Sequence, residues 1–165
     1  MLTNHRSRGA LIASAAVLAT LASALAPTSA SHAAQAKGPL VSTRATSLER
    51  ILVDRHGHTL YLLEKDKNGK SACSGACASA WPPLIATAKP RAGAGAKASR
   101  LGTTKRADGR LQVTYNHHPL YTFIKDTKKG QTKGEGLNAF GAEWYALSAA
   151  GAKVEKAAPK AARDV

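Results

Sequence analysis

The stretch "HTLYLLEKD" at positions 58–66 returns as "HPLYTFIKD" at positions 118–126, and this repetition decides the fold that the sequence predicts. Aligned without a gap at an offset of 60, "VDRHGHTLYLLEKD" (53–66) and "VTYNHHPLYTFIKD" (113–126) share six of fourteen residues. A match of this kind indicates a duplicated structural unit. Each copy has a β-branched run, a short polar turn and a second apolar run, so we interpret each copy as a β-hairpin unit.

The strand and turn patterns around the repeat agree with this interpretation. In "LQVTYN" (111–116) apolar and polar residues alternate, as in a strand with one buried face. "TLYLL" and "LYTFI" are apolar on both faces and predict central strands. "RADGR" supplies an Asp-Gly hairpin turn, and "GACASAW" before two prolines allows one helical turn. We therefore predict a mainly β fold, with two repeated β-hairpin units forming one small antiparallel sheet or sandwich and a short helical turn near the cysteines.

Composition divides the chain into segments. Basic residues, an apolar run over 10–26 and alanines before position 37 predict a secretory signal peptide at 1–36, with no transmembrane segment after its cleavage. Stretches rich in Gly, Pro, Ser or Ala predict a linker, an exposed loop at 89–100 and a disordered tail. The expected segments are a linker at 37–46, a domain at 47–150 with repeat 1 at about 48–88 and repeat 2 at about 101–148, and a tail at 151–165.

The chain is strongly basic. It has 24 Lys and Arg against 10 Asp and Glu, which gives a formal net charge of +14. Such a charge favours polyanionic partners. For an exported protein we expect an anionic cell-envelope polymer or lipid surface as the partner, and we do not expect nucleic acid.

Two cysteines, Cys73 and Cys77, allow two interpretations. In an oxidising compartment they predict a disulfide. Alternatively, two thiolates and an imidazole suit copper, so the chain could be an extracytoplasmic copper-binding or thiol-redox protein. The imidazoles would come from His56, His58, His117 and His118, which could converge if the hairpins pack around a twofold axis. The single methionine is Met1, and this favours the disulfide.

The repeated residues predict structure rather than catalysis. Tyr61 and Tyr121 share a strand face with Leu63 and Phe123, respectively, so these four side chains are expected in the core. Asp66 and Asp126 precede glycine-containing turns, where an aspartate can accept a hydrogen bond from the backbone two residues on. No Gly-x-Ser-x-Gly or His-Glu-x-x-His motif is present, and we expect no catalytic residues and no enzymatic activity.

These motifs resemble a known family. "YTFIKD" (121–126), the cysteine-containing segment with "WPPL" after the first copy and the tryptophan near the end of the second are similar to the secreted repeat family of predicted bacterial lipoproteins, which has a Yx(FWY)xxD motif. The chain departs from the pattern at Leu63, where an aromatic residue is expected, and it lacks the lipid-accepting cysteine. The resemblance implies a two-repeat fold outside the bacterial cytoplasm and no established activity. We expect an exported, non-enzymatic binding or envelope-associated module.

Overall fold

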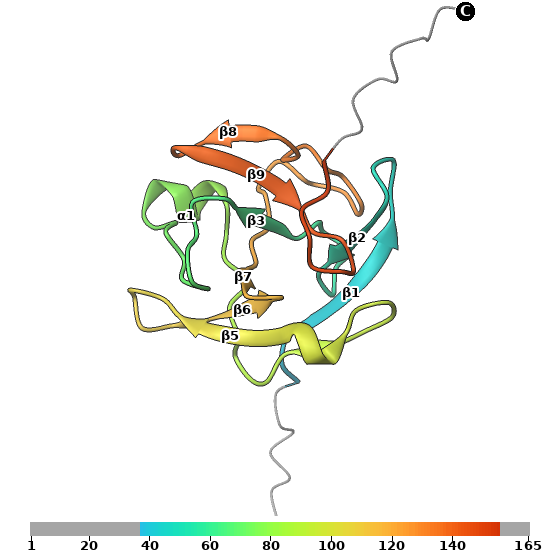
Figure 1. Cartoon of the computed structure of the whole chain (residues 1–165), viewed down its shortest axis with the longest axis horizontal. Helices are drawn as coiled ribbons and strands as arrows, with labels where there is room; N and C mark the ends of the chain where they lie inside the picture. The colour runs from blue at the N-terminus through green and yellow to red at the C-terminus, as the bar shows by residue number, and fades with distance from the viewer. Residues whose placement is uncertain (1–36, 156–165) are drawn as a thin grey trace, which may run out of the picture. The chain divides into compact units, whose positions relative to one another are not determined.

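The computed structural model describes residues 37–155, so the predicted signal peptide and the end of the predicted tail lie outside the described residues. The mainly β fold is confirmed (Figure 1). The elements are β1 (Leu40–Ala45), β2 (Arg50–Val53), β3 (Tyr61–Leu63), α1 (Ala76–Ala80), β4 (Arg91–Ala92), the 3-10 helix η1 (Ala98–Arg100), β5 (Leu101–Lys105), β6 (Leu111–Tyr115), β7 (His118–Pro119), β8 (Leu137–Ala139) and β9 (Ala142–Ala146).

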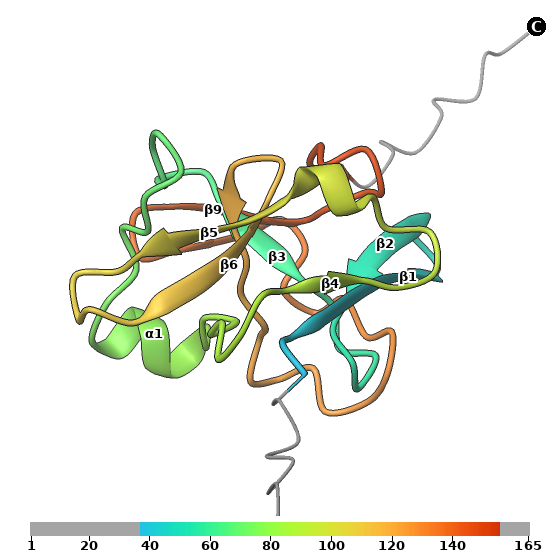
Figure 2. The same cartoon turned by 90° about the horizontal axis from the view of Figure 1, so that it is seen from below.

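The strands of residues 37–155 form three small sheets instead of a single one. Their strand orders are β2-β1-β4, β3-β9-β8 and β5-β6-β7. All neighbours are antiparallel except β1 and β4, which pair in parallel (Figures 1 and 2). The predicted hairpin turn joins β5 to β6, and the predicted helical turn is α1, which ends before Pro82.

The predicted segment boundaries are wrong in three places. Residues 37–46 are not a linker, because they contain β1 and because Val41 is fully buried. The stretch at 89–100 is not an open loop, since it supplies β4 and η1. The tail begins later than 151, because Val154 is buried and its N–H donates to the carbonyl oxygen of Ala146 over 2.8 Å. In each case backbone hydrogen bonds to a strand outside the segment order residues whose composition favours a loop.

Two tyrosine residues mark an approximate twofold axis between the copies. The N–H of Tyr61 donates to the carbonyl of Tyr121 over 2.8 Å, and the N–H of Tyr121 donates to the carbonyl of Tyr61 over 3.0 Å. Beside them, Trp81 and Trp144 stack with ring centroids 3.9 Å apart and planes 4° apart. Each tryptophan also meets one tyrosine edge-on, at 82° and 85°. The two copies therefore share one aromatic core.

The tyrosine and aspartate that recur in both copies bond across this axis rather than within each copy. The Tyr61 hydroxyl donates to Asp126 over 2.5 Å, and the Tyr121 hydroxyl donates to Asp66 over 2.8 Å. Burial raises the pKa of both tyrosines, and the neighbouring carboxylates raise it further. Burial also raises the pKa of both aspartates, while the tyrosine hydroxyls and backbone N–H groups oppose that rise. Each repeat thus supplies the partner of a carboxylate that belongs to the other repeat.

The ungapped alignment of the copies is wrong before the turn. Leu60 N–H donates to the Leu52 carbonyl over 3.0 Å, whereas Leu120 N–H donates to the Val113 carbonyl over 3.0 Å. Leu52 therefore corresponds to Val113, one position away from the Val53–Val113 match. The first turn is longer by one residue, whereas the second is a tight turn with positive φ at Asn116 and His117, which is typical of type I′. A one-residue insertion leaves the second strands aligned.

The exchanged pairing predicts which double variants are energetically coupled. In a double-mutant cycle, Tyr61→Phe and Asp126→Asn should show a coupling free energy of about 1 to 3 kcal/mol, because the two side chains share one buried hydrogen bond. The matched control combines Tyr61→Phe with Asp66→Asn, which lies in the same copy but does not contact Tyr61. That coupling should stay within about 0.5 kcal/mol. Denaturant unfolding measures both values, and stronger coupling within one copy would contradict the exchange.

The raised tyrosine pKa values predict loss of stability in alkali. The unfolded chain ionises Tyr61 and Tyr121 near the ordinary tyrosine pKa of 10.0, whereas the folded chain keeps both hydroxyls protonated to higher pH. Above about pH 10 the free energy of unfolding should therefore fall with pH, by up to about 1.4 kcal/mol per unit for each tyrosine. Tyrosinate absorbance and circular dichroism recorded together check this. Ionisation of these two hydroxyls well before unfolding would show that they are accessible.

Candidate functional site

The repeat-motif residues other than Asp66 lie in the core, and Leu63 and Asp66 also border a hollow of about 430 Å³. Tyr61 and Tyr121 are fully buried, Phe123 stacks on Trp81 at a centroid distance of 4.1 Å, and Leu63 pairs with Trp144 between β3 and β9. The expected core positions are confirmed.

The aspartates of the motif hold longer loops than expected. Asp66 Oδ1 accepts from the N–H of Ala72 over 2.7 Å, and Asp126 Oδ1 accepts from the N–H of Lys133 over 2.9 Å. Each carboxylate therefore accepts from a backbone N–H six or seven residues later in the chain, whereas the sequence predicts an N–H two residues later. Each aspartate fixes a loop at one oxygen and the other repeat's tyrosine at the second oxygen. Within the described residues, the two aspartates hold the loops and the core together.

Cys73 and Cys77 form a disulfide at the start of α1, with Cα atoms 5.3 Å apart. Both residues are buried. The Arg106 guanidinium donates to the Cys73 carbonyl over 2.7 Å and to the Gln112 side chain over 2.6 Å. This buried arginine ties the disulfide-closed turn to β6, so the turn is held by more than its covalent bond.

The four histidines do not converge. His56 and His58 lie in the turn after β2, with ring centroids 6.1 Å apart, whereas His117 lies in the turn after β6 and His118 begins β7. Within residues 37–155 no three His, Cys, Asp or Glu side chains are grouped so as to hold a metal ion. Burial and then the charge of His117 lower the pKa of His118. The approximate twofold axis exists, but tyrosines and tryptophans lie beside it, and the histidine-containing turns lie farther away.

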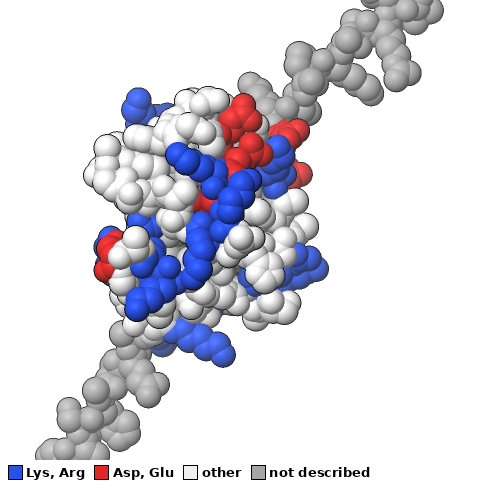
Figure 3. All heavy atoms as spheres, turned by 60° about the vertical axis from the view of Figure 1, so that its left-hand side comes forward, with Lys and Arg blue, Asp and Glu red and all other residues white. Residues whose placement is uncertain are grey.

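Charge is distributed unevenly over the surface. Figure 3 shows Lys and Arg in a long line across one face, whereas Asp and Glu gather in small groups. The acidic side chains are partly neutralised, because Asp108 pairs with Arg110 at 2.8 Å and Glu64 pairs with Lys153 at 2.9 Å. Many of the remaining cations therefore face solvent alone, and the protein carries a positive field.

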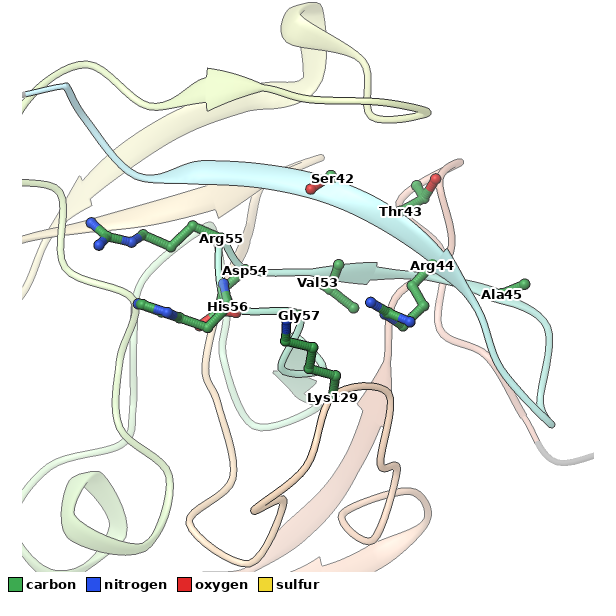
Figure 4. Close-up of a pocket in the computed structure, with 10 residues that line it drawn as sticks. All are labelled: Ser42, Thr43, Arg44, Ala45, Val53, Asp54, Arg55, His56, Gly57 and Lys129. Carbon is green, nitrogen blue, oxygen red and sulfur yellow. Dashed lines mark hydrogen bonds between the residues drawn. The ribbon is translucent and has the colours of Figure 1, made fainter.

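A basic groove lies between β1, the turn after β2 and the loop at 127–131 (Figure 4). Its volume is about 440 Å³. Arg44 and Lys129 approach the same part of the groove, while Arg55 and His56 extend toward its other end. A second hollow of about 220 Å³ shares Arg55 and His56 and reaches Lys37, so the groove continues past the turn. Arg44, Arg55 and Lys129 are the three cations of the groove, and His56 adds a fourth only when it is protonated.

The three cations of the groove are not neutralised by carboxylates of the described residues. Arg44, Arg55 and Lys129 are exposed, and none of them forms an ion pair with a carboxylate of residues 37–155. The one acidic lining residue, Asp54, is buried. Its Oδ1 accepts from the N–H groups of His56 and His58 over 2.8 and 2.9 Å. That carboxylate is therefore committed to the turn, and the groove can attract an anion.

Both copies of the repeat build the groove. The loop after Asp126 docks on the turn of the first copy, where the N–H of Gly130 donates to the Gly57 carbonyl over 2.9 Å. Gly57 has a φ of 84°, and a side chain there would meet Lys129 at 3.1 Å. The positions of Arg44, Arg55 and Lys129 correspond in the other copy to Thr104, Asn116 and Asn68, all uncharged. The fold therefore does not require the three cations.

This groove is hard to predict from the sequence. Arg44 falls in the stretch expected to be a linker, and Lys129 is far from Arg55 in the chain. A weak indication was available in the differences between the copies, since the first turn has "DRHG" where the second has "YNH".

The disulfide and copper interpretations predict different behaviour of a Cys73→Ser/Cys77→Ser variant. Closing so short a loop stabilises a protein by about 2 kcal/mol in the chain-entropy estimate. Because Arg106 still holds the turn, the variant should keep its fold and lose about that much stability in denaturant unfolding. Reduced wild type and variant are then titrated against a competing Cu(I) chelator. We expect equal, negligible uptake, whereas tight binding of one Cu(I) by reduced wild type alone would favour the copper protein.

No helix within residues 37–155 is long and apolar enough to cross a bilayer. Comparison with curated proteins and with solved structures finds no match. A family model described as a secreted repeat of unknown function matches twice, over residues 42–85 and 102–148. The matches coincide with the two copies related by the tyrosine pair, and the first includes most of β1. They confirm the resemblance and the location outside the cytoplasm, and the chain belongs to this family of secreted repeats of unknown function.

Proposed function

We propose that this protein is an exported, non-enzymatic module that binds an anionic polymer of the cell envelope in the basic groove. The observation that carries the proposal is the row of Arg44, Arg55 and Lys129, which lack carboxylate partners among the described residues and face one groove. Lys37 extends the positive lining past the turn. Unpaired cations around a groove concentrate anions and accelerate their binding.

The composition of the groove favours a phosphodiester chain. Arginine presents a planar fork that matches two phosphate oxygens, and lysine acts as a point charge on the same group. Arg44 and Lys129 stand at one part of the groove and Arg55 at another, so successive phosphates of a polymer could be contacted in turn (Figure 4). The partly polar, open lining does not enclose a small molecule. A linear polyanion suits such a surface better than a compact metabolite.

Several features support a non-enzymatic role. The two tyrosines of the repeat are buried, and their hydroxyls are committed to carboxylates. The cysteines are closed in a disulfide. Asp54, the carboxylate of the groove, accepts hydrogen bonds from two backbone N–H groups and is buried. The groove therefore offers charge and shape to an anion, and its one carboxylate is held by the turn.

Replacing the three unpaired cations of the groove should weaken polymer binding. The Arg44→Ser/Arg55→Ser/Lys129→Ser variant should bind poly(glycerol phosphate) about tenfold or more weakly than wild type, because up to three phosphate contacts are lost. The slope of log K against log salt concentration should fall by about two to three for the same reason. Equilibrium binding at several salt concentrations measures both quantities, with neutral dextran as the blank ligand.

A charge-matched control separates the groove from general electrostatics. The Lys70→Ser/Lys105→Ser/Lys125→Ser variant loses the same formal charge at exposed positions outside the groove. It should retain most of the affinity. Equal weakening of the two variants would show diffuse attraction without a site, and binding insensitive to salt would exclude an electrostatic partner. Polyglutamate in place of the phosphate polymer tests whether carboxylates serve as well.

A further inference from the structure

The turn between β8 and β9 holds an aromatic residue in an unusual conformation. Phe140 has a φ of 58°, in the left-handed region, and its side chain is 45% exposed. The other non-glycine residues with positive φ among residues 37–155 are two asparagines and a histidine, types that tolerate this region. A bulky aromatic residue does not, and such outliers concentrate at functional sites. Since its ring is largely exposed, Phe140 is a poor candidate for a core residue.

The first copy has no hairpin at the comparable place. Trp81 and Trp144 stack on each other, but α1 precedes Trp81, whereas the β8–β9 hairpin carries Trp144. The residues of α1 are alanine, cysteine and serine, and none is aromatic. The first copy therefore reaches the shared core without an exposed aromatic residue, and Phe140 is particular to the hairpin of the second copy.

The tip lies in a largely uncharged surface. α1 and the β8–β9 turn occupy the same side of the molecule (Figure 1). Ala78 and Ala80 of α1 and Ala139 and Ala142 of the hairpin pack against one core cluster. Figure 3, in which this side comes forward, shows an uncharged area next to the line of Lys and Arg.

Two further exposed apolar residues belong to this side. Leu137, at the start of the same hairpin, is 39% exposed. Ile124 is 56% exposed, and its N–H donates to the carbonyl of Ala80, the last residue of α1, over 3.2 Å. Three of the four exposed large hydrophobic side chains of residues 37–155 therefore adjoin α1 or the hairpin. The fourth, Leu111, lines a separate groove with Leu101.

We propose that the β8–β9 tip, with Phe140 at its apex, inserts into the interface of an anionic lipid bilayer. The tip is a turn rather than a groove, so it suits a deformable apolar layer. Lys65 lies next to it, with Nζ 3.6 Å from the position of a Cβ on Gly141, and Lys125 follows Ile124. Neither lysine pairs with a carboxylate of the described residues. An apolar tip with adjacent cations supplies the two contributions that interfacial binding needs.

This surface is distinct from the basic groove. The groove is lined by β1 and the turn after β2, on the opposite side of Figure 1 from α1 and the β8–β9 tip. Membrane docking at the tip would leave the groove free for a polymer. The inference is thus independent of the proposed polymer binding, and either can fail alone.

Vesicle flotation with the exported protein tests the inference. Wild type should float with vesicles containing phosphatidylglycerol and much less with pure phosphatidylcholine. Phe140→Asn, a residue suited to positive φ, should keep the fold yet lower the partition coefficient about fivefold. Leu111→Asn is the matched control, because Leu111 has the same 45% exposure. It should float like wild type.

A fluorescent variant reports insertion directly. Trp81 and Trp144 are buried, so the indole of Phe140→Trp would be the one that meets lipid. Its emission should shift to the blue with phosphatidylglycerol vesicles and become protected from aqueous quenchers. Unchanged emission, absence of wild-type flotation, or equal flotation of Phe140→Asn and wild type would each overturn the inference. Equal losses of flotation in Phe140→Asn and Leu111→Asn would also overturn it. In the Arg44→Ser/Arg55→Ser/Lys129→Ser background, Phe140→Asn should still reduce flotation about as much as it does in wild type.

Discussion

Asp66, which is half-buried, and Asp126, which is buried, each accept a hydrogen bond from the tyrosine of the other repeat. A buried carboxylate without a partner costs several kcal/mol, so neither copy is complete alone. The stacked tryptophans impose the same condition, because separating the copies would expose both indoles. Residues 65 positions apart must therefore meet before either half is stable. Such non-local contacts make folding cooperative and slow compared with helical proteins of this size.

The same exchange positions the groove. Asp126 fixes the loop that follows it, and this loop crosses to the turn of the first copy, where Gly130 bonds to Gly57. Lys129 is thereby placed beside Arg44, a residue of the other repeat (Figure 4). In the mirror arrangement the loop after Asp66 approaches the second turn, with Gly69 close to the carbonyl of His117. The core thus determines where both loops lie, and their sequences determine what each presents to solvent.

The repeat and its core were predictable because burial leaves a periodic record in the sequence. The strand at 111–115, the Asp-Gly hairpin turn and the helical turn before Pro82 are predicted correctly, whereas "LYTFI" (120–124) makes only isolated bridges at Tyr121 instead of a central strand. β1 and β4 were missed because their order comes from pairing with distant strands, which composition does not report. The aspartate partners were missed because hydrogen bonds between copies have no local pattern. The groove was missed since its cations come from three separate segments.

Differences between the copies carry more information about function than their identities do. Tyrosine, aspartate and tryptophan recur because the shared core cannot form without them. Arg44 and Lys129 correspond to Thr104 and Asn68 in the other copy, and the hairpin that carries Phe140 stands where the first copy has α1, which contains no aromatic residue. In a duplicated fold, each structural position occurs twice. Where one copy folds without a charge or an exposed aromatic residue, folding does not explain the presence of that residue in the other copy. Both proposed binding surfaces lie at positions of this kind, and this is the physical reason for assigning them to partners outside the chain.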